Sequence, residues 1–317
     1  MVIVGGGPTG INVAVEATKA NLSYVIIEKG VLANSIYHFP VNMTFFSTSV
    51  NLEIADIPFI SHSDKPTRKE ALEYYRRIFD HYNLNIRFYE AVKEVINDGA
   101  SFKVISDKMC YLAKNLVVCT GFFDKPRLLN IPGESLPKVR HYYDDVHPYV
   151  GQKVLVVGAA NSACDVALET WQKGAEVTMA VREEHLYKKV KYWILPNIEN
   201  RIEEGSITAH FQTELVEIKE DNVVLRNNEK TWEIENDFVL AMTGYHPDFE
   251  LLDKLGVPLD TQDSSKPIHD PETLETSVPN LYVAGVINAG LLTSKLFIEN
   301  TRDHGTKIIS DILKKKT

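Results

Sequence analysis

Short apolar runs alternate with helix-length amphipathic stretches along most of the chain. The apolar runs include residues 2–4, 24–28, 116–121, 154–158 and 237–244, and apolar positions at helical spacing fill much of the sequence between them. Short buried strands that alternate with helices are typical of a parallel sheet covered by helices. The pattern therefore predicts an α/β fold.

Two strand–helix–strand units stand out in this pattern. The first has a strand at Val2–Val4, a helix at Ile11–Asn21 and a strand that ends at Glu28. The second has a strand over residues 154–158, a helix at Ser162–Lys173 and a strand that ends at Arg182. Each unit has the form of a Rossmann-like dinucleotide-binding domain.

A glycine turn joins the strand to the helix in each unit. The first turn, GGGPTG, contains Gly5, Gly7, Pro8, Thr9 and Gly10, and the second, GAANSA, contains Gly158, Ala160, Asn161 and Ser162. Free backbone N–H groups at a helix N-terminus favour a pyrophosphate there. Two such turns predict two bound dinucleotides, although Ala160 weakens the second match because a middle glycine allows the closest approach.

The residues at the ends of the second strands distinguish the two sites. Glu28 is a carboxylate that suits unmodified ribose hydroxyls, whereas Arg182 is a cation that suits a 2′-phosphate. The first site is therefore predicted to bind FAD and the second NADPH. His185, Lys188, Lys189 and Lys191 either extend the phosphate pocket or form a solvated basic face.

The second domain is predicted to be an insertion in the first. Apolar strands end in Thr-Gly at both 120–121 and 243–244, which suggests two crossings between domains. The FAD-binding domain would comprise residues 1–122 and 245–317, and the NADPH-binding domain residues 123–244. A strand at 281–285 and a helix at Thr293–Leu313 would complete the first domain.

Further cofactor contacts are expected from loops and strand ends. Residues 30–64 read as irregular and precede a helix at Lys69–Tyr82, then strands at 86–95 and 102–106. Phe45 and Phe46 are either core anchors or, with Ser47, neighbours of the flavin ring. The remaining candidates for cofactor binding are Lys29, Val92, Thr120, Gly121, Gly244, Gly285 and Val286.

Composition narrows the class of protein. The formal net charge of −9 argues against nucleic acid or an anionic membrane as a partner. Neither a signal peptide nor a spanning apolar run is visible, so a cytoplasmic location is expected. Cys110, Cys119 and Cys164 form no C-x-x-C pair and are interpreted as inert, buried residues. No metal-ligand set is recognised.

The order of motifs resembles the low-molecular-weight thioredoxin reductase type of pyridine nucleotide-disulfide oxidoreductase. GGGPTG, CTG, GAANSA, AVR and MTG carry this resemblance. SIYHFPVNMTFFSTS, KYWILPNIENRIEEGSI and FIENTRDHG are more similar to the bacillithiol disulfide reductase (YpdA) family, which lacks C-x-x-C. The resemblance implies FAD in the first domain, NADPH in the second and a bacillithiol disulfide-like acceptor.

Two positions depart from these families. The YpdA family is similar in its glycine turn but has GGGPCG, with a cysteine implied to be redox-active, where this chain has Thr9. A threonine cannot form a mixed disulfide. Thioredoxin reductases usually have an aspartate after the late glycine, whereas this chain has Val286 after Gly285. Backbone N–H groups at 285–287 would then contact the flavin cofactor.

The sequence leaves the electron acceptor and the catalytic residues open. The leading hypothesis is an FAD-containing, NADPH-oxidising reductase that uses a small-molecule or small redox-protein acceptor. A flavin monooxygenase, a ferredoxin- or flavodoxin-NADP reductase and a non-catalytic redox sensor are the alternatives. His304 and Glu299 are either proton donors near the flavin or surface and capping residues. A homodimer is a further expectation.

Overall fold

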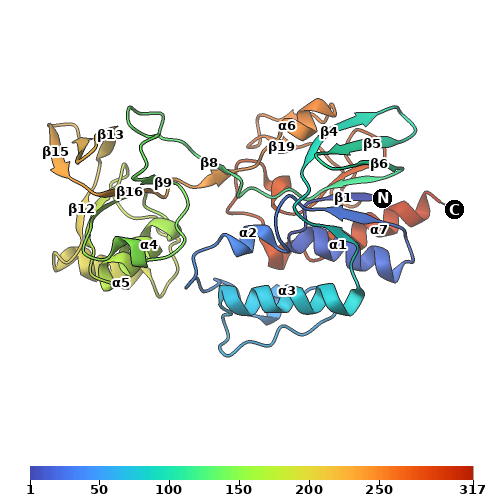
Figure 1. Cartoon of the computed structure of the whole chain (residues 1–317), viewed down its shortest axis with the longest axis horizontal. Coiled ribbons are helices and arrows are strands. Elements are labelled where there is room, and N and C mark those ends of the chain that lie inside the picture. Colours follow the sequence, from blue (N-terminus) through green and yellow to red (C-terminus); the bar gives the residue numbers. More distant parts are fainter. Residues whose placement is uncertain (317) are drawn as a thin grey trace. The chain divides into compact units, whose positions relative to one another are not determined.

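A computed structural model describes residues 1–316, and Figure 1 shows its elements. The chain divides into two compact units. Unit 1 comprises Met1–Lys125 and the chain from Tyr245 onward, and unit 2 comprises Pro126–Gly244. The strands β8 (Lys125–Pro126) and β17 (Tyr245–His246) pair where the chain passes between the units.

Unit 1 contains a five-stranded parallel sheet in the order β20-β7-β1-β2-β3. Its strands are short and, apart from the edge strand β3, almost wholly buried, as continuous Val, Ile and Leu runs predict for a sheet covered on both faces. Their bounds are β1 Val2–Val4, β2 Val25–Ile27, β3 Ile86–Arg87, β7 Leu116–Val118 and β20 Leu281–Val283.

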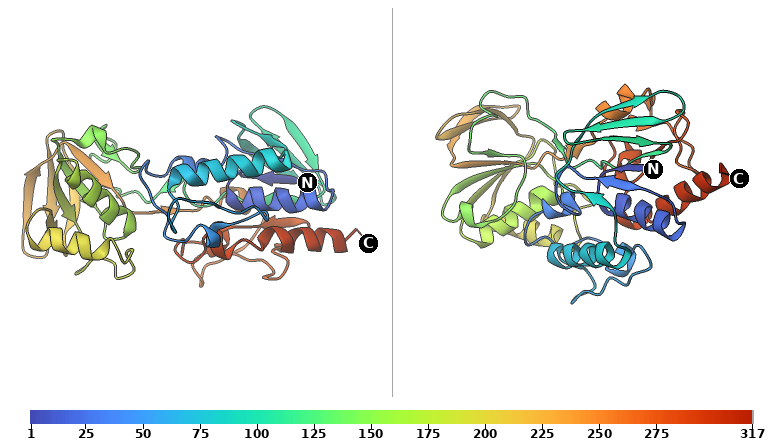
Figure 2. Two further views of the ribbon diagram at one scale, coloured as in Figure 1. Left: turned by 90° about the horizontal axis from the view of Figure 1, so that it is seen from below. Right: turned by 45° about the vertical axis from the view of Figure 1, so that its right-hand side comes forward.

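Three long helices pack in unit 1, namely α1 (Pro8–Lys19), α3 (Arg68–Tyr82) and α7 (His304–Lys314). The helix α7 packs along α1, and Figure 2 shows the two side by side. A capping box between Thr67 and Glu70 begins α3, because each side chain accepts a backbone N–H of the other residue. The predicted helices at 11–21 and 69–82 are confirmed with small shifts of their ends.

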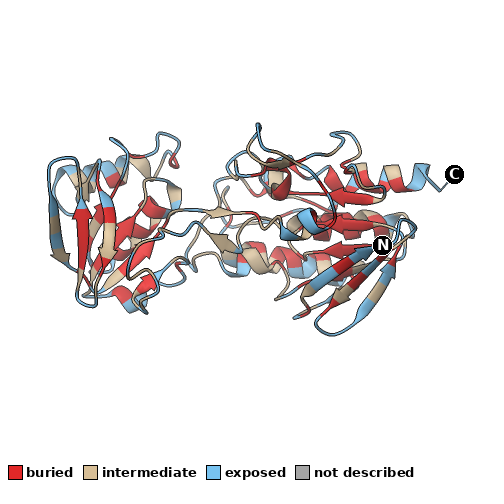
Figure 3. Ribbon diagram, turned by 90° about the horizontal axis from the view of Figure 1, so that it is seen from above, coloured by how far each residue is buried: buried red, intermediate tan, exposed pale blue. Residues whose placement is uncertain are grey.

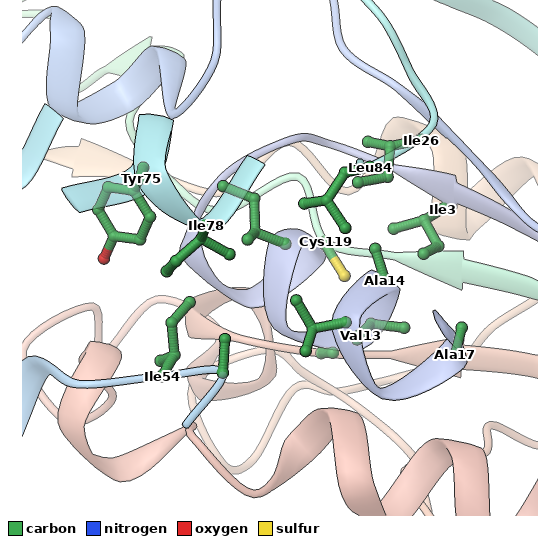
Figure 4. Close-up of a cluster of buried hydrophobic side chains, with 14 of the residues drawn as sticks. Ile3, Val13, Ala14, Ala17, Ile26, Ile54, Tyr75, Ile78, Leu84 and Cys119 are labelled. Carbon is green, nitrogen blue, oxygen red and sulfur yellow. The ribbon is translucent and has the colours of Figure 1, made fainter. Parts of the chain in front are cut away.

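The main core of unit 1 lies between the sheet and these helices. Figure 4 shows Ile3 of β1, Val13 and Ala14 of α1 and Ile78 of α3 in this cluster, together with the Cys119 thiol. Figure 3 shows the same concentration of buried residues along the parallel strands and the inward sides of the helices. The core therefore holds β1 and α1 rigidly on either side of the first glycine turn.

An antiparallel sheet of β4 (Val92–Asn97), β5 (Phe102–Ser106) and β6 (Cys110–Ala113) packs on the other face. The single strand predicted over residues 86–95 is wrong, because its two ends belong to different sheets. Tyr89 lies between them with a φ of 53°, a left-handed conformation that ends the first strand.

The last helix starts later than predicted. The sequence pattern suggested Thr293–Leu313, but α7 spans His304–Lys314. Asn300 and Thr301 make local bonds instead: Asn300 Oδ1 accepts from Phe297 N at 2.6 Å, and Thr301 Oγ1 donates to Phe297 O at 2.9 Å. Such side-chain bonds compete with helix formation.

Shorter elements complete unit 1. They are the helices α2 (Asn34–Tyr37) and α6 (Glu250–Lys254), the strands β18 (Leu259–Asp260) and β19 (Lys266–Pro267), and the 3₁₀ helices η1 (Val50–Leu52), η3 (Val286–Ala289) and η4 (Ile298–Asn300).

Unit 2 repeats the architecture with its own five-stranded parallel sheet, in the order β12-β11-β10-β16-β9. The bounds are β9 Val139–Arg140, β10 Lys153–Val157, β11 Glu176–Ala180, β12 Thr208–His210 and β16 Phe238–Ala241. The helices α4 (Asn161–Gln172) and α5 (Leu195–Glu203) cover one face, and η2 (His147–Tyr149) precedes β10.

An antiparallel sheet covers the other face of the unit 2 sheet. It consists of β13 (Glu214–Ile218), β14 (Asn222–Arg226) and β15 (Thr231–Glu235), which bury Leu215, Val223 and Leu225 against Leu155 of β10. None of the helices in residues 1–316 has the length and apolarity that crossing a bilayer requires.

Candidate functional site

Three strand ends meet at the carboxyl edge of the unit 1 sheet. Val4, Val118 and Val283 are paired side by side as the last residues of β1, β7 and β20. The residues that follow them are the first glycine turn, Thr120-Gly121 and Gly285-Val286. Ligands of open α/β sheets bind at this edge, so these three predicted segments lie at one candidate site.

The glycines of the first turn have different roles. A Cβ on Gly10 would lie 2.0 Å from Gly5 O, and one on Gly5 would lie 2.6 Å from Cys119 O, so both glycines are required by backbone packing. A Cβ on Gly7 would meet nothing within 4 Å. Backbone atoms therefore pack closely around Gly5 and Gly10, whereas the space beside Gly7, at the N-terminus of α1, is open.

The open side of this turn is the N-terminus of α1. Gly7 is the N-cap, makes no side-chain cap bond and is followed by Pro8. The first intrahelical bond runs from Ile11 N to Gly7 O at 2.9 Å, so the amides of Thr9 and Gly10 precede it. Donors at a helix N-terminus beside open space suit a pyrophosphate.

Glu28 is buried directly after β2, with 5 % of its surface exposed. Its Oε2 accepts from Gly6 N at 2.6 Å and its Oε1 accepts from Gly30 N at 2.8 Å. Burial raises the pKa of the carboxyl, and these two backbone bonds oppose that rise. Each oxygen keeps further acceptor capacity, as ribose hydroxyls would require. Lys29 Nζ lies 2.8 Å from Asp124 Oδ2, and its predicted cofactor contact stays a prediction.

Thr120 supplies an independent indication of a ligand. Its Oγ1 is buried and has no hydrogen-bond partner among residues 1–316. A buried hydroxyl without a partner costs free energy. Because Thr120 lies at the edge shared with the glycine turn, an FAD with polar groups there would fit the residues present. Gly121 follows with a φ of 72°.

Gly285, in the turn after β20, lies against Thr9 of the first glycine turn. It has a φ of 86°, and a Cβ at this position would lie 2.7 Å from Thr9 Oγ1 and 3.2 Å from Thr9 Cβ. Its N–H donates to His304 Nδ1 at 3.0 Å. Val286 then begins η3. Thr9 is thus in direct contact with the segment predicted to hold the flavin.

Phe45 and Phe46, which were predicted to be either core anchors or neighbours of the flavin ring, differ in their burial. Phe45 is half-buried and packs against the main core, as the anchor interpretation expects. Phe46 is 56 % exposed with Lys65 Nζ 5.0 Å from its ring centroid, so the anchor interpretation is wrong for Phe46. Ser47 is half-buried beside it, and Val92 is half-buried at the start of β4. Their predicted cofactor contacts stay predictions.

The second glycine turn, in unit 2, has the same close backbone packing at its first glycine as the first turn has at Gly5. Gly158 has a φ of 135°, and its Cβ would lie 2.6 Å from Met242 O. Ala160 is the N-cap of α4 without a side-chain cap bond. Asn161 Oδ1 accepts from Lys191 N at 2.8 Å, which ties the loop after β11 to the start of α4. Ser162 is exposed in the first helical turn.

The predicted phosphate pocket is only partly basic. Arg182 lies two residues after β11 with its side chain 74 % exposed, and His185, Lys188 and Lys189 are also exposed. Lys191 is different, because it is buried and its Nζ lies 2.7 Å from Asp165 Oδ2. The solvated-face interpretation is therefore wrong for Lys191, and its part in a phosphate pocket stays a prediction. Gly244 is the last residue of unit 2, with a φ of 88°.

The cysteines have two environments. Cys119 and Cys164 are buried, and burial raises the pKa of both thiols, that of Cys164 to about 12. Their interpretation as inert residues agrees with this. Cys110 is exposed on β6, contrary to the expectation of burial. Among residues 1–316, no group of His, Cys, Asp and Glu has the arrangement of a metal site.

His304 and Glu299 differ in their surroundings, and the proton-donor role of each stays a prediction. Burial lowers the pKa of His304 to about 4, so the imidazole is neutral at pH 7 and its Nδ1 is an acceptor. Glu299 lies in η4 before the last helix, not on it. Sequence reasoning also missed Asn12 and Asn288, which are polar residues buried in apolar surroundings. Their position within apolar runs was the available signal.

Comparisons with known proteins identify the family. Residues 2–285 match the model of the pyridine nucleotide-disulphide oxidoreductases. The chain belongs to this family. It is 40 % identical over 317 residues to the Bacillus subtilis bacilliredoxin reductase Bdr, covering 99 % of this chain and 98 % of the relative.

Solved structures agree with this assignment. The bacillithiol disulfide reductase Bdr (YpdA) from Staphylococcus aureus is 39 % identical with a TM-score of 0.97, covering 100 % of this chain and 98 % of the other. The Bacillus cereus enzyme is 40 % identical with a TM-score of 0.96, covering 99 % and 98 %. A Lactococcus lactis thioredoxin reductase, at 19 % identity and a TM-score of 0.77 over 99 % and 97 %, shares the fold.

These findings confirm the predicted family, the fold of two Rossmann-like domains and the class of flavoprotein oxidoreductase. FAD and NADPH, the cofactors predicted from the sequence, are those of the family. The contacts of the individual site residues with these cofactors remain predictions.

Proposed function

We propose that the chain oxidises NADPH and reduces a bacillithiol-type disulfide, either the low-molecular-weight disulfide itself or one carried on a bacilliredoxin. In balance, NADPH, a proton and one disulfide yield NADP⁺ and two thiols. The observation that carries the proposal is the 40 % identity to a bacilliredoxin reductase over nearly the full length of both chains. Both glycine turns also keep a strand–turn–helix geometry.

The first unit is proposed to hold FAD through four contacts. The amides at the start of α1 would bind the pyrophosphate, and the buried Glu28 carboxylate would accept from the ribose hydroxyls. The unpartnered Thr120 hydroxyl and the turn after Gly285 would face the rest of the cofactor. When bound, FAD supplies the two-electron chemistry that links a hydride donor to a disulfide.

The second unit is proposed to select NADPH over NADH. Arg182 has an exposed guanidinium just past the end of β11, where a Rossmann site meets the adenosine ribose. A guanidinium pairs with a phosphate through several donors at once. The neighbouring Lys188 is exposed and adds positive charge.

A spectral titration tests the cofactor half of this proposal. The purified chain should be yellow, and its flavin should bleach with NADPH much faster than with NADH. A panel of bacillithiol disulfide, an oxidised bacilliredoxin, glutathione disulfide, cystine, ferredoxin and oxygen then tests the acceptor. Turnover with the first two should exceed all others. A chain without flavin, or one that prefers ferredoxin, contradicts the proposal.

The residue at position 9 determines whether a thiol relay can run through the first glycine turn. A thiol relay through position 9 is excluded in this chain, because threonine forms no mixed disulfide. Thr9→Cys restores a thiol where the related family has one, in contact with Gly285. We expect it to raise disulfide turnover at least tenfold, with Thr9→Ser as the control that keeps the size but not the thiol. Equal turnover in all three would show that position 9 carries no relay.

A ferredoxin-NADP reductase activity is the second candidate. The chain has no C-x-x-C pair, and it is 24 % identical to a ferredoxin-NADP reductase of Ignicoccus hospitalis over 90 % of its length. The ferredoxin arm of the panel separates the two candidates, because a disulfide reductase leaves ferredoxin oxidised.

A further inference from the structure

The first residue of α7 is hydrogen-bonded to the turn at the flavin edge of the sheet. His304 is 7 % exposed, and its Nδ1 lies 3.0 Å from the Gly285 amide nitrogen. Because the amide can only donate, Nδ1 must be the unprotonated nitrogen of the ring. The hydrogen bond therefore exists only while the imidazole is neutral.

The same turn supports Thr9. The space that a side chain on residue 285 would need is filled by Thr9, whose Oγ1 is 2.7 Å and whose Cβ is 3.2 Å from an ideal Cβ there. Gly285 has a φ of 86°, which glycine adopts without strain. A shift of Gly285 would thus be transmitted directly to the first turn of α1.

The helix α1 in turn holds the start of α7. Asn12 is buried, and its Oδ1 accepts from Gly305 N at 3.1 Å. Thr9 and Asn12 are three residues apart and so share one face of α1. Contacts therefore close a ring: from Thr9 to Gly285, from Gly285 to His304, and from Gly305 back to Asn12.

We propose that His304 is a positioning residue for FAD, because it fixes the Gly285 turn and, through it, the phosphate-binding turn at the start of α1. The inference rests on the FAD site of the proposed function and names a residue outside the glycine turns. It assigns the C-terminal helix a direct part in holding the cofactor. His304 itself needs no contact with the flavin.

The electrostatic surroundings keep this imidazole neutral. Burial lowers the pKa of His304, with smaller contributions from Lys307 and His269 and an opposing one from Asp303, and the result is a pKa of about 4. Asp303 and Lys307 flank the histidine in sequence, and His269 belongs to the segment before β20. At pH 7 the acceptor is therefore in place, and protonation near pH 4 removes it.

Two substitutions separate the hydrogen bond from simple packing. His304→Leu keeps much of the volume but removes the acceptor, whereas His304→Gln offers an amide oxygen to Gly285 N. FAD affinity is measured by equilibrium dialysis, and the visible spectrum of the bound flavin is recorded at pH 7. His147→Leu, an exposed histidine of unit 2, is the control.

We expect His304→Leu to bind FAD about tenfold or more weakly and to shift the flavin spectrum, because a buried N–H loses its acceptor. His304→Gln should recover most of the affinity. Between pH 7 and pH 4 the FAD affinity of wild type should fall. The FAD affinity of His304→Gln should fall less over the same range. Equal affinity and spectrum in wild type and His304→Leu overturn the inference, as does equal impairment of the two variants.

The outcomes also separate this inference from the proposed function. A wild-type chain that binds no FAD contradicts the function, whereas one that binds FAD regardless of residue 304 contradicts only the role of His304. If His304→Leu does not fold, the pH dependence of wild type against His304→Gln decides. The inference fails if wild type and His304→Gln lose the same FAD affinity between pH 7 and pH 4.

Discussion

At the scale of single residues, Arg182 makes the sharpest prediction about specificity. Its side chain is 74 % exposed, and its weak contact with Glu183 Oε1 at 4.0 Å leaves it able to pair with a phosphate. Arg182→Gln should raise the KM for NADPH about tenfold or more, since a charge-assisted bond contributes about 1.5–3 kcal/mol. The KM for NADH should change little, and steady-state kinetics with both nucleotides measure this.

A matched control for Arg182 lies in the same unit. Arg226 is also exposed, on β14, where its Nη2 lies 3.1 Å from Glu214 Oε2. Arg226→Gln removes the same charge from the unit without touching the nucleotide edge of its sheet. If it raised the KM for NADPH as much as Arg182→Gln does, the general charge of the unit would explain the effect.

His304 also predicts a pH dependence of stability. Its pKa in the folded chain is about 4, below its ordinary value of 6.5, so the unfolded chain binds the proton more readily. The contribution to stability is complete above pH 6.5 and is lost as the pH falls through about 4. The free energy of unfolding should fall by up to about 3 kcal/mol over this range.

Urea unfolding at pH 7, 5.5 and 4 measures this decline. His304→Gln lacks the titrating group and should show a smaller decline than wild type. Parallel pH profiles for the two proteins would assign the decline to other groups.

The residues of the site differ in how well their sequence reveals them. Glu28 and Arg182 follow apolar strands of a repeated unit, so their place at a strand end is readable from periodicity alone. Lys191 has the same charge as its neighbours but is buried and pairs with the half-buried Asp165, a contact between α4 and a loop that no local pattern contains. His304 likewise meets Gly285 only through the packing of α7 on α1.

At the scale of elements, the first glycine turn yields a paired prediction. Gly10→Ala places a methyl group 2.0 Å from Gly5 O, so α1 must move away from β1, and stability should fall by about 1–3 kcal/mol. Gly7→Ala meets no protein atom within 4 Å, and its φ of −77° suits alanine. This variant should be as stable as wild type without FAD.

FAD binding distinguishes the two alanine variants further. The methyl group of Gly7→Ala enters the open space before α1, where the pyrophosphate is proposed to lie, so FAD affinity should fall about tenfold or more although the apoprotein is intact. Urea unfolding of the apoproteins and dialysis against FAD measure both quantities. Full FAD affinity in Gly7→Ala would place the pyrophosphate elsewhere.

The elements that sequence predicted well are those that local patterning determines. The strands β1, β2, β7 and β10 and the helices α1, α3 and α4 agree with their apolar periodicity. The later start of α7 depends on the side-chain bonds of Asn300 and Thr301, and the split of residues 86–95 depends on one left-handed residue, Tyr89. The sheet of β13 to β15 was not predicted, although short connections at 219–221 and 227–230 join its three consecutive strands.

At the scale of the whole molecule, the two units have separate cores. The sheet of unit 2 and both layers that cover it come entirely from residues 126–244, and the clusters around Ile3 and Val118 come entirely from unit 1. An inserted unit with its own core can unfold independently of its host. A homodimer and a cytoplasmic location stay predictions at this scale.

Calorimetry should therefore show two unfolding transitions, each shifted by a different nucleotide. FAD at about 100 times its Kd should stabilise the unit 1 transition by about 2.7 kcal/mol, and 2′-phosphate-bearing NADP⁺ should do the same for unit 2. For a tenfold loss of affinity, Gly7→Ala should reduce only the first shift, to about 1.4 kcal/mol, and Arg182→Gln only the second, because each changes one turn or strand end. A single transition that both nucleotides raise equally would mean that the units unfold as one body, and that neither variant can assign a cofactor to a unit by this method.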